Sequence, residues 1–220
     1  MIDALLSTVA PHICSGCQEY GTVLCKSCID DINNDDFGRC LWCLRPTVHM
    51  HQCGACTRKL KTAGAWVVGE RAGVLKRLLN DYKFESHREA ATALALLLDA
   101  AIPVLSTDTV VTWVPTAPAH TRQRGFDHAA RLARVFAVLR GLPCQSLLIR
   151  QRGGSQHELG KKAREAAAAH AFRLKQAPHQ PQILLIDDIL TTGATMKACV
   201  GLLRAAGTDV SVAVVARQPQ

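Results

Sequence analysis

One stretch of the chain, residues 183–196, joins two adjacent acids to a loop of small hydroxyl residues. Four branched apolar residues come first and indicate a strand that is buried on both faces and ends at the acids. Beyond the loop, apolar residues recur at helical spacing from Met196 to Leu203. The acids are Asp187 and Asp188, and the loop consists of Thr191, Thr192, Gly193, Ala194 and Thr195.

A loop of this kind at the start of a helix offers free backbone N–H groups, hydroxyls and the positive end of a helix dipole. These groups favour phosphate. Acids at the carboxyl end of a parallel strand lie where open α/β sheets bind ligands, so the pair suits the two hydroxyls of a ribose. A simpler interpretation is a turn in which Asp188 and Thr192 only cap the helix. The order of strand, acids, loop and helix favours the ligand site.

This order resembles the signature of type I phosphoribosyltransferases, the enzymes that use phosphoribosyl pyrophosphate (PRPP). A second loop follows another apolar run, residues 109–114, and contains Pro115 and Thr116. In PRPP enzymes such a loop faces the pyrophosphate, and the position and composition of this one are compatible with that role.

Eight of the ten cysteines form four Cys-x-x-Cys pairs. A gap of two residues lets both thiolates of a tight turn point at one tetrahedral metal, so the spacing predicts two structural Zn²⁺ ions. Redox dithiols are the less favoured alternative. We expect sequential pairing, although an interleaved arrangement also fits, and His49 and His51 lie close enough to Cys53 to compete as ligands. The expected sets are Cys14, Cys17, Cys25 and Cys28 on one ion, and Cys40, Cys43, Cys53 and Cys56 on the other.

Charge is distributed unevenly along the chain. Residues 1–56 hold six acids and three bases, a net charge of −3, whereas the whole chain carries +8. Between Pro118 and Lys175 there are twelve Lys or Arg residues and three acids. Such a run is usually a solvated surface, but glycines beside paired arginines suggest a mobile cationic loop that closes over a polyanion. We therefore expect any binding of single-stranded DNA to use this basic part and not the acidic zinc module.

The chain also shows no sign of a membrane location. No basic segment followed by an apolar core opens the sequence, so no secretory signal is visible. The longest apolar run, residues 93–98, is too short to span a bilayer. We expect a cytoplasmic protein without membrane insertion.

Along nearly its full length the chain resembles the ComF family of phosphoribosyltransferase-like proteins. The resemblance implies an α/β fold, in which residues 1–58 form a double zinc ribbon. Residues 59–220 would form a type I phosphoribosyltransferase domain, a mostly parallel sheet flanked by helices. It also implies a link to DNA uptake in natural competence, with competence-machinery proteins as candidate partners. The matching stretches are the four cysteine pairs, Tyr82-Lys83-Phe84, Val114-Pro115, Arg124-Gly125-Phe126, Arg150, Gln156, Leu159, Arg164, Ala171-Phe172 and residues 186–195.

The resemblance further implies that the ligand is PRPP, with Mg²⁺ on its pyrophosphate. A catalytic hood would lie at about residues 150–164. Three departures fall where an acceptor or partner would be touched: Asp127-His128 for the usual Asn-Gln, a missing threonine before Gln156, and Ala167 for the usual Asn. Phosphoribosyl transfer to a nitrogen acceptor is the leading function, and a non-catalytic protein that senses PRPP and binds single-stranded DNA or a partner is the alternative. The implied site residues are Asp187, Asp188, Thr191, Thr192, Gly193, Ala194, Thr195, Pro115, Thr116 and Lys83 for PRPP, and Arg150, Arg152 and Gln156 for the hood.

Overall fold

The computed structural model describes residues 12–34, 37–47, 52–84, 88–117, 121–122, 125–151 and 171–219. The helices in these ranges include α2 (Lys26–Asn33), α3 (Gly54–Leu60), α4 (Gly73–Phe84), α5 (Arg88–Ala101), α7 (His128–Arg140) and α9 (Ala194–Ala205). The strands are β1 (Gly64–Glu70), β2 (Thr109–Trp113), β3 (Leu148–Arg150), β4 (Phe172–Leu174), β5 (Gln182–Leu190) and β6 (Asp209–Arg217). None of the described helices is both long enough and apolar enough to cross a bilayer.

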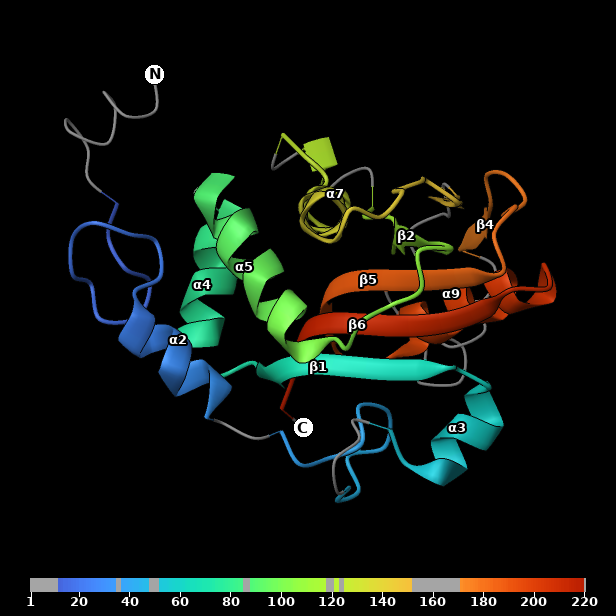
Figure 1. The fold of residues 1–220 in the computed structure, drawn as a ribbon, viewed down its shortest axis with the longest axis horizontal. Helices are drawn as coiled ribbons and strands as arrows, with labels where there is room; N and C mark the ends of the chain where they lie inside the picture. The colour runs from blue at the N-terminus through green and yellow to red at the C-terminus, as the bar shows by residue number, and fades with distance from the viewer. Residues whose placement is uncertain are drawn as a thin grey trace, which may run out of the picture.

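A four-stranded parallel sheet forms the centre of the molecule, with the strand order β1-β6-β5-β2 (Figure 1). β5 is an inner strand, and its residues 183–186 are at most 1% exposed. A strand that is covered on both faces needs apolar side chains at every position, which explains the unbroken branched run. The predicted mostly parallel sheet is confirmed, and β3 and β4 form a separate antiparallel pair.

Helices cover both faces of this sheet, and each face has its own apolar core. On what we call the first face, α4, α5 and α7 pack over Leu184 and Ile186 of β5. On the second face, α9 packs over Ile183 and Leu185. Successive side chains of a strand point to opposite faces, so β5 contributes to both cores.

The two cysteine-rich segments pack on opposite faces of the sheet. Cys14 and Cys28 belong to the core of the first face, whereas Cys40 and Trp42 belong to the core of the second. Figure 1 shows α2 beside α4 near one end of β1, and α3 near the other end of that strand. The boundary that we drew between residues 58 and 59 falls within α3. Both cysteine segments therefore share their apolar cores with the sheet.

One predicted strand end is wrong. We expected the strand to end at the two acids, but β5 continues to Leu190, which is still paired with Arg217 of β6. The acids stay in the strand because β6 is equally long and its backbone groups satisfy those of β5. The polarity of two side chains did not show how far the neighbouring strand extends.

Candidate functional site

Each cysteine-rich segment brings four sulfur atoms together, which confirms the sequential pairing and excludes the interleaved one. His49 and His51 lie outside the described residues. The sulfurs of Cys14, Cys17, Cys25 and Cys28 (the Cys14 group) lie within 4.8 Å of one another, as do those of Cys40, Cys43, Cys53 and Cys56 (the Cys40 group).

The two groups repeat the same backbone design. The first Cys-x-x-Cys turn of each ends in a left-handed residue, Gln18 with a φ of 66° and Leu44 with a φ of 61°. The N–H of each of these residues donates to the carbonyl of the first cysteine of its group, in both cases over 2.9 Å. The third cysteine then caps the helix that carries the fourth, α2 in one group and α3 in the other. A turn and a helix start thereby bring two pairs of thiols to one point.

The spacing of the sulfur atoms fits zinc. Cys17 Sγ and Cys25 Sγ are 3.6 Å apart, and the equivalent pair in the other group, Cys43 Sγ and Cys53 Sγ, is also 3.6 Å apart. A tetrahedral zinc with Zn–S bonds of about 2.3 Å requires about 3.8 Å between sulfurs. The N–H groups of Gly16 and Cys25 donate to Cys14 Sγ, which favours the thiolate that binds metal. Both groups are therefore compatible with structural zinc ions.

The hydroxyl-rich loop, residues 191–195, leads directly into α9. Gly193 caps the helix with a φ of +76°, a conformation that favours glycine. The N–H of Ala194 lies 3.4 Å from the hydroxyl oxygen of Thr192, to which it donates. Thr191, Gly193 and Thr195 line a cavity of about 360 Å³, which also borders the loop after β2. The first turn of α9 thus presents an anion-binding helix end to this cavity, which we call the β5 cavity.

The two acids near the end of β5 have different surroundings. Asp188 points to the first face, where its Oδ2 lies 2.6 Å from Lys83 Nζ and 3.2 Å from His128 Nε2. Asp187 lines the β5 cavity beside the 191–195 loop. Its Oδ1 accepts a hydrogen bond of 2.9 Å from the N–H of Asp188. The two predicted ribose ligands are therefore adjacent, but they differ in their partners.

These surroundings shift the pKa values of the two acids in opposite directions. Burial, and then the charge of Asp188, raises the pKa of Asp187 well above its ordinary value. Burial also acts on Asp188, but the hydrogen bond from His128 and the charge of Lys83 outweigh it and hold the pKa of Asp188 well below its ordinary range. These shifts favour the charged form of Asp188 and disfavour the charged form of Asp187.

Basic and polar residues from other elements complete the β5 cavity. The hydroxyl of Tyr82 donates to the carbonyl of His128 over 2.6 Å, which ties the end of α4 to the start of α7. His128 was not predicted as a site residue, because only the folded chain brings the start of α7 next to β5. The lining from outside β5 and α9 includes Lys83, Pro115, Thr116, His128 and Arg150.

Of the three predicted hood residues, only Arg150 lies in the described part of the chain. Its guanidinium lies 5.3 Å from the centre of the Phe172 ring, so β3 and β4 together hold it at the cavity. Arg152 and Gln156 lie outside the described residues. Thr116, predicted to face the pyrophosphate, donates its hydroxyl to Asp127 Oδ1 over 2.9 Å. Asp127 in turn caps α7.

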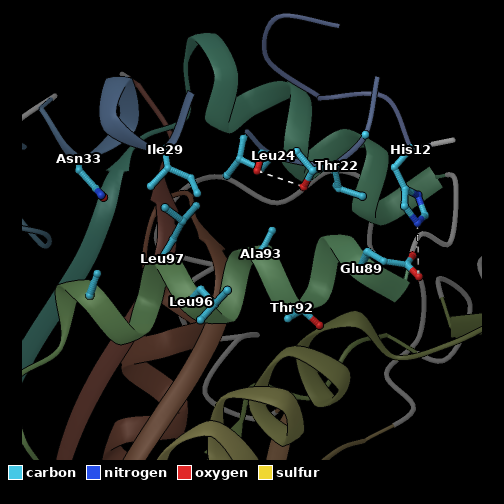
Figure 2. Close-up of a pocket in the computed structure, with 13 residues that line it drawn as sticks. His12, Thr22, Leu24, Ile29, Asn33, Glu89, Thr92, Ala93, Leu96 and Leu97 are labelled. Carbon is cyan, nitrogen blue, oxygen red and sulfur yellow. Dashed lines mark hydrogen bonds and ion pairs between the residues drawn. The ribbon is translucent and has the colours of Figure 1, made fainter. Parts of the chain in front are cut away.

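A second hollow of similar size, about 350 Å³, lies between α2 and α5 (Figure 2). Apolar side chains such as Ile29, Ala93 and Leu97 form much of its lining, and the pair His12 and Glu89 lies at one end. The β5 cavity instead combines a helix N-terminus, hydroxyls, cations and an acid with a shifted pKa. That combination makes the β5 cavity the candidate site.

A parallel sheet with acids and a hydroxyl-rich loop near the end of an inner strand, preceded by two Cys₄ groups, defines a phosphoribosyltransferase-like protein with a double zinc ribbon. Among solved structures, the chain is similar to the glutamine PRPP amidotransferase from B. subtilis, with a TM-score of 0.42 and 20% identity, over 61% of this chain and 30% of that one. It is also similar to the orotate phosphoribosyltransferase from Aeropyrum pernix, with a TM-score of 0.39 and 20% identity, over 64% of each chain. The class rests on the strand order and the site, not on these scores.

Comparison with curated proteins identifies the family. The chain is 30% identical over 177 residues to the DNA utilization protein YhgH of Escherichia coli K12, covering 74% of this chain and 77% of that protein. It is also 30% identical over 175 residues to YhgH of Salmonella typhimurium LT2, with the same coverage. No family model matches the chain. The chain belongs to the family of YhgH, the ComF-like family that its sequence resembles.

Proposed function

We propose that the chain binds PRPP in the β5 cavity and transfers the phosphoribosyl group to a nitrogen acceptor. The observation that carries this proposal is the lining of one cavity of about 360 Å³, which joins the first turn of α9 to Asp187, Lys83 and Arg150. A sugar with phosphate groups at both ends needs an anion-binding helix end, an acceptor for its hydroxyls and cations opposite the helix end.

Each part of the cavity has a role in this proposal. The 5′-phosphate lies at the 191–195 loop, where backbone N–H groups and threonine hydroxyls donate to it. Asp187 accepts a hydrogen bond from one ribose hydroxyl. Lys83 pairs with Asp188 and also lines the cavity, so it can turn toward the pyrophosphate and free Asp188 for the second hydroxyl. Mg²⁺ bound to the pyrophosphate would neutralise part of its charge.

Transfer in such a site depends on positioning and charge, and it needs no covalent nucleophile. When the bond between C1′ and the pyrophosphate oxygen breaks, positive charge develops on the ribose and negative charge on the leaving group. Lys83 and Arg150 line the cavity and face that negative charge, while the neighbouring carboxylate of Asp188 favours the positive one. The nitrogen acceptor then attacks C1′ from a held position.

A second candidate function is a non-catalytic protein that senses PRPP and binds single-stranded DNA or a competence partner. The name of the relatives, DNA utilization protein, and the bases between residues 118 and 175 favour it. Arg131 of that segment is half-buried and stacked over the Phe126 ring, whereas Arg134, Arg173 and Lys175 are exposed. DNA binding would therefore use the exposed bases. Both candidate functions place the protein in the cytoplasm.

Two measurements separate these functions. Titration calorimetry with PRPP and Mg²⁺ tests binding, and pyrophosphate release from PRPP in the presence of nucleobases, amines or single-stranded DNA tests transfer. Release that depends on one acceptor supports the enzyme. PRPP binding without release, together with DNA affinity that falls steeply with salt, supports the second function. A wild-type protein that does not bind PRPP overturns both.

A further inference from the structure

The Cys40 group lies directly against the 191–195 loop. A Cβ atom placed on Gly193 would lie 3.6 Å from the ring of Trp42. Trp42 follows Leu41 and lies between Cys40 and Cys43. A hollow of about 470 Å³ is lined by Cys43 and Cys56 of this group together with Ala194 and Lys197 of α9. The first turn of α9 and the Cys40 group are thus neighbours, although more than a hundred residues separate them in the sequence.

Arg217, the last residue of β6, links the two regions directly. Its side chain is buried, with 1% of the residue exposed. Its Nε donates to the carbonyl of Leu41 over 3.1 Å, and its Nη1 donates to the carbonyl of Leu190 over 2.9 Å and to that of Thr191. One planar guanidinium therefore joins the turn that carries Cys40 and Cys43 to the start of the 191–195 loop.

The burial of this guanidinium needs a physical reason. Arginine keeps its charge in proteins, and a buried charge costs free energy unless its donors are satisfied. Here carbonyl oxygens of Leu41, Leu190, Thr191 and Gln218 accept hydrogen bonds from Nε and Nη1 of Arg217, with the Gln218 carbonyl accepting over 3.1 Å. These bonds form only when the Cys40 turn and the loop hold their mutual position. The position of the Cys40 turn and the position of the 191–195 loop are therefore coupled.

A second chain of contacts fixes the ring of Trp42 from the metal side. Its indole Nε1–H donates to Gln52 Oε1 over 3.0 Å, and the amide of Gln52 donates to Thr57 Oγ1 over 2.7 Å. Gln52 precedes Cys53 and Thr57 follows Cys56, so the residues flanking the last two metal ligands orient the ring that packs against Gly193.

We propose that the Cys40 group is a positioning element for the anion site, acting on the 191–195 loop through Arg217 and Trp42. Loss of its metal then weakens phosphate binding at that loop, whereas loss of metal from the Cys14 group does so far less. This inference rests on the proposed function only in naming PRPP as the ligand of the loop. The contacts of Arg217 and Trp42 stand independently of it.

The first experiment replaces Arg217 with lysine, which keeps the charge but loses the planar fork that reaches both Leu41 and Thr191. Hydrogen exchange of the backbone amides in residues 191–197 should speed up about tenfold. Arg71→Lys is the matched control, because the Arg71 guanidinium donates to side-chain oxygens of Asn80 and Gln218. Exchange that is equally slow in folded Arg217→Lys protein and in the wild type overturns the proposal.

The second experiment compares Cys43→Ser with Cys17→Ser. Each is the exposed second cysteine of its group, so both variants remove one ligand at the same place in the repeated design. Cys43→Ser should speed amide exchange in residues 191–197 and weaken PRPP affinity about tenfold, with a smaller effect of Cys17→Ser on both. The zinc content of each variant is measured as a control, to check that the two variants lose comparable amounts of metal.

Equal effects of the two cysteine variants on the loop overturn the proposal. Failure of the proposed function gives a different result. A wild-type protein that does not bind PRPP refutes PRPP as the ligand, while the exchange rates in residues 191–197 still decide whether the Cys40 group positions the loop. Arg217→Lys protein that does not fold leaves the decision to the cysteine pair.

Discussion

The two faces of the sheet carry the same kinds of parts in different arrangements. Each has an apolar core, a Cys₄ group and one of two adjacent acids. On the first face, the acid is Asp188, paired with Lys83 and His128. On the second face, Asp187 borders the β5 cavity, and the Cys40 group contacts the 191–195 loop through Trp42.

The difference shows that the Cys-x-x-Cys motif determines where a metal can bind. It does not determine which part of the fold the Cys₄ group supports. The Cys14 group is braced by Arg77 of α4, which donates to the carbonyls of Ser15 over 2.8 Å and Gly16 over 3.0 Å. The Cys40 group has the same turn, yet the carbonyl of Leu41 accepts from Arg217 beside the candidate site. The first group therefore supports a helix, and the second supports the loop.

The largest effect is expected from the acids. Asp188→Asn leaves Lys83 and His128 without their buried carboxylate and should lower the free energy of unfolding by about 3–5 kcal/mol. Asp187→Asn removes an acid whose charged form is disfavoured by burial, so stability should stay equal or rise slightly. Urea unfolding at pH 7 measures both variants. An equal loss of stability in the two variants would contradict the distinction between Asp188 on the first face and Asp187 on the second.

A glycine tests the Cys14 group. A Cβ on Gly16 would lie 2.2 Å from Cys28 Sγ, so Gly16→Ala should displace that ligand, release one zinc ion and cost about 2–3 kcal/mol of stability. Gly54→Ala is the control in the Cys40 group, because its Cβ would meet only the end of the Arg58 side chain at 3.5 Å. Elemental analysis gives the zinc content of each. Full zinc content in Gly16→Ala would contradict the close packing of this group.

The opposite pKa shifts predict opposite pH dependences. An aspartate in the unfolded chain titrates near about pH 3.9. Because the pKa of Asp187 is raised in the fold, its stabilising contribution is complete below that pH and is lost as pH rises toward the folded pKa. Asp187→Asn should abolish this loss, so the stability difference between variant and wild type grows from about pH 4 upward.

For Asp188 the sign is reversed. Its pKa is lowered by the hydrogen bond from His128 and the charge of Lys83 despite burial, so its contribution is present above about pH 3.9 and is lost as pH falls below it. Asp188→Asn should therefore lose part of the wild type's acid sensitivity. Unfolding curves from pH 3 to pH 8 check both predictions, and a difference independent of pH for Asp187→Asn would refute the raised pKa.

The smallest effect is expected at Trp42. Trp42→Phe keeps an aromatic ring against Gly193 but removes the hydrogen bond to the buried Gln52, at a cost of about 1 kcal/mol. PRPP affinity should fall a few-fold because the ring is less firmly oriented. Trp66→Phe, on β1 and packed against the first face, is the control for a Trp-to-Phe change. Thermal unfolding and calorimetry measure the pair.

Parts of this comparison could be predicted from sequence. The four Cys-x-x-Cys spacings are local, because two residues between thiols determine a turn, and they led to the correct sulfur sets. The branched run at residues 183–186 and the glycine-containing loop before Met196 likewise predicted β5, the loop and α9.

Other parts depend on contacts between distant segments. Asp187 and Asp188 are chemically identical, and only the position of α4 and α7 gives one of them two basic partners. Arg217 lies at the end of an ordinary apolar strand, and nothing near it in sequence indicates that it reaches Leu41 and Thr191. The two cysteine groups share the same Cys-x-x-Cys spacing in the sequence. This spacing does not show that the Cys14 group and the Cys40 group pack on opposite faces of one sheet.

The most direct test of the account is calorimetric titration of PRPP with Mg²⁺ into wild-type protein and Asp187→Asn. We predict one PRPP bound per chain, and a loss of affinity of about tenfold or more in the variant, because a ribose hydroxyl loses the carboxyl group that accepts its hydrogen bond in a closed site. The same variant should unfold at an unchanged or higher urea concentration, so the loss cannot come from misfolding. Absence of binding to the wild type, or equal affinity in the two proteins, would contradict the assignment of the β5 cavity as the PRPP site.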